Sequence, residues 1–144
     1  MFKAVRFPLL IGFIAVLACW RLGFGLDLSQ RSDALAFAGT LASVGTTMLG
    51  FMAAALAIIA SISHTHLVSM MRKTGHYKEL LASLFAGCVF FLAIAVSGFG
   101  LLYGAPISST TVWALVGLHV AALISVWDIG VKFWFVLRNL NPDN

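Results

Sequence analysis

The chain has 144 residues, of which 61% are hydrophobic and 10% charged, with a mean hydropathy of +1.02 and a net charge of +4. Because soluble domains are typically about 45–50% apolar and about 25% charged, this composition excludes an ordinary soluble domain. It also argues against a nucleic-acid-binding protein, since the basic residues lie beside apolar stretches and are not gathered on a soluble face.

Four apolar stretches follow one another along the chain. They cover residues 7–26, 35–62, 80–103 and 112–137. Each has the ~20 residues that a helix needs to cross the ~30 Å hydrocarbon core of a bilayer. In lipid a helix of this length satisfies its own backbone hydrogen bonds. We therefore predict an all-α integral membrane protein with four transmembrane helices in a single domain, residues 1–144.

The first span follows Lys3 and Arg6. A basic start before an apolar run is also typical of a cleaved secretory signal, but we expect a retained span. A short loop, residues 25–32, separates it from the second span, and Asp33 is placed to cap that helix.

The second span runs into a more polar segment. No proline interrupts residues 34–73, so we expect one long helix that continues out of the membrane. Gly75 should end this helix by adopting a left-handed conformation. Spans two and three then form a long antiparallel hairpin whose tip is residues 63–79.

Turn and capping residues mark the end of the third span and the start of the fourth. Gly104, Ala105 and Pro106 should end the third span, and residues 108–111 should cap the fourth.

Charged and aromatic residues predict the orientation. Lys and Arg lie before span one, in the hairpin tip and after span four, whereas the loop after span three carries no charge. By the positive-inside rule, both termini and the tip are cytoplasmic. Aromatic residues should mark the two interfaces, the outer one at Trp20, Tyr103 and Trp113, and the inner one at Tyr77, Trp127 and Trp134.

Rows of small residues lie at helical spacing in spans two and four. Such rows allow the close backbone approach that holds helices together in lipid. They fit either the packing of a closed four-helix bundle within one chain or an interface between subunits. We expect a homo-oligomer and favour a tetramer. The residues concerned are Gly39, Ser43, Thr46, Gly50, Ala54, Gly117 and Ala121.

Asp128 is the most unusual polar residue, because a carboxylate within a membrane helix is costly and needs a partner or water. Lys132 lies one turn further on, so a local pair could satisfy it. Alternatively, Asp128 lines a water-filled passage or pairs across a subunit interface.

His119 lies near the middle of span four. We expect a structural histidine whose hydrogen-bond partner is Thr46, Thr47 or Ser97; a proton relay is the alternative. A haem site would need a second histidine at the same depth. His64 and His66 lie closer to the cytoplasm than His119, which argues against a haem, and they point away from each other, which argues against a shared metal ion. We therefore expect no haem, no metal and no other cofactor. No arrangement of enzyme residues is present in the sequence, and we expect no enzyme.

The hairpin tip is basic. Its residues would orient the chain and contact lipid headgroups, or dock a cytoplasmic partner protein. The candidates are Arg72, Lys73, His76, Tyr77 and Lys78.

The middle of the chain resembles a known kind of protein. Residues 50–61, GFMAAALAIIAS, are followed by residues 67–73 and then by residues 74–81, TGHYKELL. This pattern, over residues 42–84, resembles small four-span bacterial and prophage membrane proteins of anti-phage systems; the remaining chain is similar in topology alone. The RexB type, the membrane channel of a prophage exclusion system, is similar in length and layout, and the KwaA-type defence membrane subunit is a second comparison.

The resemblance implies a bacterial inner-membrane subunit of anti-phage defence that senses or responds to infection with a cytoplasmic partner. For the RexB type it implies a gated ion channel. The polar residues along the spans are few for a permanently open pore, so we expect a closed bundle that opens conditionally or acts as a membrane-bound sensor. The alternatives are a phage holin, a structural membrane anchor of a larger complex and, last, a haem anchor.

Overall fold

A computed structural model of the chain describes residues 2–21, 30–61, 66–104 and 108–138. This part is 95% helical and contains no strand. The helices are α1 (Phe2–Arg21), α2 (Arg31–Ser61), α3 (His66–Thr74), α4 (His76–Leu102) and α5 (Ser109–Arg138). The all-α prediction is confirmed for the described residues.

Three of these helices have the length and composition to cross a membrane. They are Arg31–Ser61, His76–Leu102 and Ser109–Phe135. The described apolar stretch of α1, Arg6–Ala18, is shorter than a full span. The prediction of a membrane protein with several spans is therefore supported by three helices, and the fourth span stays a prediction.

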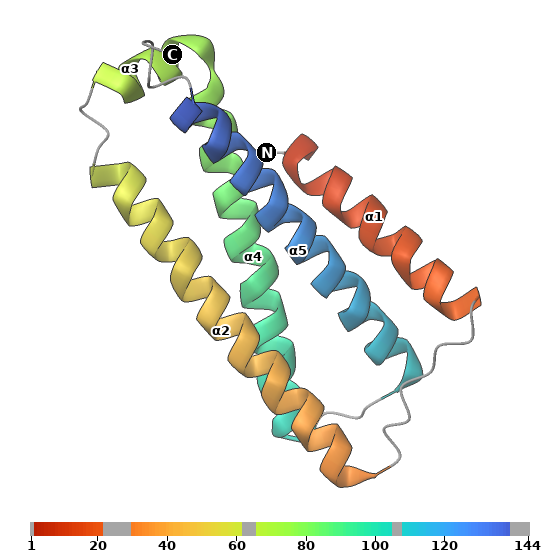
Figure 1. Ribbon diagram of the computed structural model, residues 1–144. Coiled ribbons are helices and arrows are strands. Elements are labelled where there is room, and N and C mark those ends of the chain that lie inside the picture. The colour runs from red at the N-terminus through yellow and green to blue at the C-terminus, as the bar shows by residue number, and fades with distance from the viewer. Residues whose placement is uncertain (1, 22–29, 62–65, 105–107, 139–144) are drawn as a thin grey trace.

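The four long helices lie side by side in the order α2, α4, α5, α1 (Figure 1). α4 contacts α2 on one side and α5 on the other, and α1 packs against α5 with a smaller contact to α4. Within the described residues, α2 approaches neither α1 nor α5 at the level of the backbone. The chain thus forms a layer of helices in which α2 and α1 are the two outer members.

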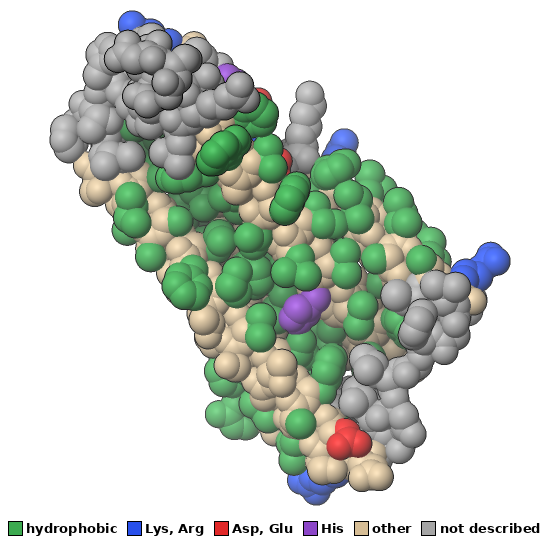
Figure 2. All heavy atoms as spheres, in the orientation of Figure 1, with side chains coloured by type: hydrophobic (Ala, Val, Ile, Leu, Met, Phe, Trp, Pro, Cys, Tyr) green, Lys and Arg blue, Asp and Glu red, His purple; other side chains and the backbone are tan. Residues whose placement is uncertain are grey.

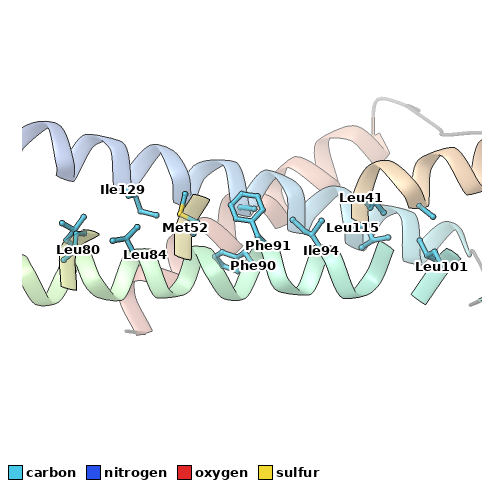
Figure 3. Packing of buried hydrophobic residues seen from close by; sticks show 13 residues of the cluster. Leu41, Met52, Leu80, Leu84, Phe90, Phe91, Ile94, Leu101, Leu115 and Ile129 are labelled. Atoms are coloured by element: carbon cyan, nitrogen blue, oxygen red, sulfur yellow. The ribbon is translucent and has the colours of Figure 1, made fainter. Parts of the chain in front are cut away.

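The core of the layer follows α4. Phe91 and Leu84 are 1% exposed and Ile94 is fully buried. Met52 from α2 and Ile129 from α5 reach the same row of side chains, as Figure 3 shows. Because α4 has neighbours on both sides, it buries apolar residues on two faces, whereas α2 buries one.

The turns at the two ends of α4 agree with the predicted stops. Gly75 has φ 81° and Gly104 has φ 98°, the left-handed region that glycine adopts without strain. The Ser108 hydroxyl accepts a hydrogen bond from the backbone N–H of Thr111 at 3.1 Å, which caps α5. In contrast, α2 begins at Arg31, so Asp33 lies in its first turn.

The hairpin tip differs from the expected continuous helix. α2 is described to Ser61, and α3 is a separate helix that lies across the end of the layer (Figure 1). Val68 of α3 is only 1% exposed. We attribute the change of direction to amphipathicity, because α3 can bury this apolar side against α4, which a helix projecting into water could not do.

The surface matches a membrane environment. Hydrophobic side chains cover the body of the visible face, and basic side chains gather at the two ends of the layer (Figure 2). The start of α1, the end of α5 and α3 all lie at one end (Figure 1).

Candidate functional site

A polar cluster joins α4 to α5 near the end of the layer where α3 lies. The Lys132 ammonium donates hydrogen bonds to Asp128 Oδ2 at 2.5 Å and to Ser83 Oγ at 2.6 Å. The Ser83 hydroxyl donates to the same Asp128 oxygen at 3.0 Å. Each of the three side chains thus contacts the other two, and we call Ser83, Asp128 and Lys132 the polar triad.

The expected local pair between Asp128 and Lys132 is present, and it forms part of this larger arrangement. Ser83 is 1% exposed, whereas the side chains of Lys132 and Asp128 are 31% and 40% exposed. The triad therefore has a buried hydroxyl and a charged pair open on one side. The pair carries no net charge, which lowers the cost of placing it beside lipid.

Sequence reasoning missed Ser83. A single serine in an apolar helix is ordinary, and α-helix spacing relates it to Glu79 of the same helix and not to α5. The available signal was topological: spans three and four are antiparallel neighbours, so a residue two turns into α4 lies beside one close to the end of α5. A comparison of how deep each polar residue of spans three and four lies in the membrane would have placed Ser83 next to Asp128.

Gly87 lies one turn beyond Ser83, where α4 meets side chains of both neighbouring helices. A Cβ atom at Gly87 would lie 3.4 Å from Ile129 Cδ1, 3.5 Å from Met52 Sδ and 3.7 Å from Ser125 Oγ. Side chains of both α2 and α5 thus meet over this glycine. The triad consequently sits beside a tightly filled junction of three helices.

His119 does not bond to the partners that we expected. Its Nδ1 lies 3.2 Å from the carbonyl oxygen of Leu115, one turn earlier in α5. Thr46 donates to the Ala42 carbonyl at 2.8 Å and Ser97 to the Ala93 carbonyl at 2.7 Å, each within its own helix. Partly exposed on the side of α5, His119 is a locally bonded histidine in the single chain.

The hairpin tip brings its candidate residues close together. The Arg72 guanidinium lies over the Tyr77 ring, 5.1 Å from its centre. Lys73, His76 and Lys78 are exposed. Gly75 makes this possible, because its left-handed turn reverses the chain between α3 and α4.

The small residues of span two fall on the side of α2 that faces away from α4. Ser43, Thr46, Gly50 and Ala54 are exposed. A Cβ atom at Gly39 or Gly50 would meet nothing within 4 Å. This row does not pack within the chain, so the intramolecular interpretation does not hold for it.

A different row of α2 makes the close contact. A Cβ atom at Gly45 would lie 2.6 Å from the backbone nitrogen of Ala95. One at Gly98 would overlap the backbone nitrogen of Ala42 and lie 2.9 Å from the Ala38 carbonyl oxygen. Sequence reasoning missed these residues, although they have the same small-residue spacing as the outer row.

In span four the packing interpretation holds. A Cβ atom at Gly12 of α1 would lie 2.5 Å from the Gly117 carbonyl oxygen and 3.3 Å from the Ala121 Cβ. Ala121 is fully buried. Gly117 and Ala121 therefore let α1 pack directly on the α5 backbone.

The described residues contain no group of three or more His, Cys, Asp or Glu side chains that could hold a metal ion. His64 and the side chain of His66 lie outside the described residues, as does Trp20's side chain. No family model, curated protein or solved structure matches this chain.

Proposed function

We propose that this protein is the membrane subunit of a bacterial phage-exclusion system, which resides in the inner membrane as a homo-oligomer and acts with a cytoplasmic partner protein. Its output is a gated ion conductance that depolarises the membrane. The observation that carries the proposal is the polar triad, a charged pair of α5 that is hydrogen-bonded to a buried serine of α4 in a largely apolar layer.

The open shape of the layer supports an oligomer. One chain exposes large apolar side chains on every long helix, including Phe13, Phe51 and Trp127 at 63%, 65% and 76%. The described part of one chain has no polar row of its own that could conduct ions. A conducting path therefore needs more than one copy, and the triad's exposed side supplies charged groups to such an assembly.

We propose four spans with both termini and the tip in the cytoplasm. The start of α1, the end of α5 and the helix α3 all lie at the same end of the layer (Figure 1). This placement fits the charge bias of the sequence. Reporter fusions after Lys73 and after Tyr103 test this. The first should be cytoplasmic and the second extracytoplasmic, and the opposite pattern would refute the topology.

The function is tested in a bacterial host that carries the gene together with its genomic neighbours. Phage plating efficiency and the fluorescence of a potential-sensitive dye are measured after infection. We expect protection and depolarisation with the partner gene present, and loss of both for Asp128→Asn. Asp33→Asn, an exposed carboxylate at the opposite end of the layer, is the matched control.

The same experiment distinguishes a holin. A holin kills the host at a defined time when it is expressed alone, without phage. Harmless expression of the chain alone, combined with protection in the presence of its partner, supports the exclusion system. Timed lysis by the chain alone would replace our proposal.

A further inference from the structure

We propose that α3 and the first turns of α4 form a binding surface for anionic phospholipids, with Arg72, Lys73 and Lys78 holding the phosphate headgroup. The inference rests on the membrane arrangement proposed above but not on a role in phage exclusion. The sequence allowed two roles for the hairpin tip, contact with lipid headgroups and docking of a partner protein. We propose the first of these.

α3 has the build of a helix that lies at a membrane surface. Val68 is buried against the layer, whereas Arg72, one turn further along the helix, and Lys73 are exposed near its end. The helix lies across the end of the layer (Figure 1). A short amphipathic helix in this position places its cations at the level of the headgroups.

The Arg72 guanidinium is held in place before any lipid binds. It lies over the Tyr77 ring at 5.1 Å, a cation–π contact that limits the side-chain conformations. Gly75, with φ 81°, brings Tyr77 under Arg72. The planar guanidinium suits a phosphate group, and its fixed position lowers the entropy lost on binding.

The charge of the surface favours an anion. Arg72, Lys73 and Lys78 are exposed and Glu79 is the one exposed carboxylate among residues 72–79, which leaves two positive charges in excess (three minus one). Within the described part of the chain, no carboxylate is paired with any of the three cations.

An apolar stripe continues directly from these cations. Lys78 lies on the same face of α4 as the residues at i+3, i+7, i+11, i+14 and i+18. All five are apolar and exposed: Leu81 38%, Phe85 52%, Val89 48%, Leu92 50% and Val96 62%. A cation followed by an apolar stripe of this length matches a phosphate headgroup with an acyl chain, and a water-soluble partner would match only the cation.

The test uses the purified full chain in detergent and native mass spectrometry. Phosphatidylglycerol or phosphatidylcholine is added at equal concentration, and the fraction of protein with bound lipid is measured. We expect the wild-type chain to retain phosphatidylglycerol preferentially. Each cation near an anionic surface is worth roughly a fivefold change in binding, so R72Q/K78Q should lose about twenty-fivefold.

The matched control is R21Q/R31Q, which removes two exposed arginines at the other end of the layer. It should retain phosphatidylglycerol as the wild type does. Lys78→Gln alone, with a predicted loss of about fivefold, serves when the double variant does not fold. Arg72→Lys keeps the charge but loses the planar group, and it should bind less than the wild type.

Three outcomes would overturn the proposal. Equal loss in R72Q/K78Q and R21Q/R31Q would indicate attraction by net charge alone. Displacement of the lipid by an equal concentration of glycerol phosphate would identify a site for free phosphate. Unchanged lipid binding, with loss of a copurifying protein from R72Q/K78Q, would assign the tip to a protein partner.

Discussion

The central helix α4 is joined to α2 and to α5 by two different kinds of contact. Towards α2, small residues bring backbone against backbone at Gly45 and Gly98, and the described residues of the two helices share no side-chain hydrogen bond. Towards α5, hydrogen bonds tie Ser83 to Asp128 and Lys132. The first contact depends on shape, and the second depends on charge and on the satisfaction of polar groups.

The difference teaches which substitutions each contact can tolerate. Dispersion between closely packed helices is lost when the backbones separate by even a fraction of an ångström. A half-exposed ion pair can adjust, because water or headgroups can replace a lost partner. The α2 contact should therefore be sensitive to size, whereas the α5 contact should be sensitive to polarity.

The largest effect is expected for Gly45→Leu, which places a side chain where the α4 backbone lies 2.6 Å from the substituted position. Overpacking of this kind costs about 1–3 kcal/mol, and contact with backbone places it at the upper end of that range. The measurement is the unfolding midpoint in detergent, followed by circular dichroism. Gly50→Leu is the control in the same helix, since its Cβ meets nothing within 4 Å; equal losses in both variants would mean that size at this contact is not the cause.

A smaller loss is expected for Lys132→Met. It removes the ammonium from Asp128 and leaves a charge with Ser83 as its remaining partner in the triad. Because the pair is about a third exposed, we expect about 1–2 kcal/mol, below the value for a fully buried pair. The double variant D128L/K132M should be less destabilised than the sum of the two single variants, and strict additivity would argue against coupling of the two side chains.

Ser83→Ala is expected to cost about 0.6 kcal/mol, the average for a hydrogen bond between membrane helices. Ser97→Ala on the same helix is the matched control, because Ser97 bonds only to the Ala93 carbonyl of α4. Unfolding in detergent with a graded denaturant can compare the two. If Ser97→Ala lowered the free energy of unfolding as much as Ser83→Ala, the hydrogen bonds of Ser83 to α5 would make no extra contribution to stability.

The smallest effect on the fold is expected for Gly39→Leu, at most about 0.5 kcal/mol, because its outer position in α2 has open space. The same variant also tests whether the outer side of α2 is a subunit contact. If copies of the chain associate through this side of α2, crosslinking in membranes should show fewer oligomers for Gly39→Leu than for the wild type. Unchanged oligomers would place the subunit contact elsewhere.

Local features of this fold could be read from the sequence. The left-handed stop at Gly75, the cap at Ser108 and the pair of Asp128 with Lys132 each involve residues within one turn of one another. Their geometry depends on the backbone nearby and hardly on the neighbouring helices. Such features are therefore predictable from a single chain.

The inward faces of the helices could not be read in the same way. In a soluble protein the polar side of a helix marks the outside, but lipid is as apolar as the protein interior. Gly45 and Gly50 lie in overlapping rows with the same small-residue spacing, and only the position of α4 decides which row packs. The direction of α3, the order of the helices in the layer and the contact of Ser83 depend on the same missing information.

The unequal lengths of the outer helices have a mechanical consequence. At 1.5 Å per residue, α1 with its 20 residues is about 30 Å long, and α2 with its 31 residues is about 46 Å long. The length of α1 equals the ~30 Å thickness of the hydrocarbon core, whereas α2 exceeds it and has to lean or project beyond the hydrocarbon. Thinning the surrounding lipid would therefore increase the hydrophobic mismatch of α2 more than that of a helix as short as α1.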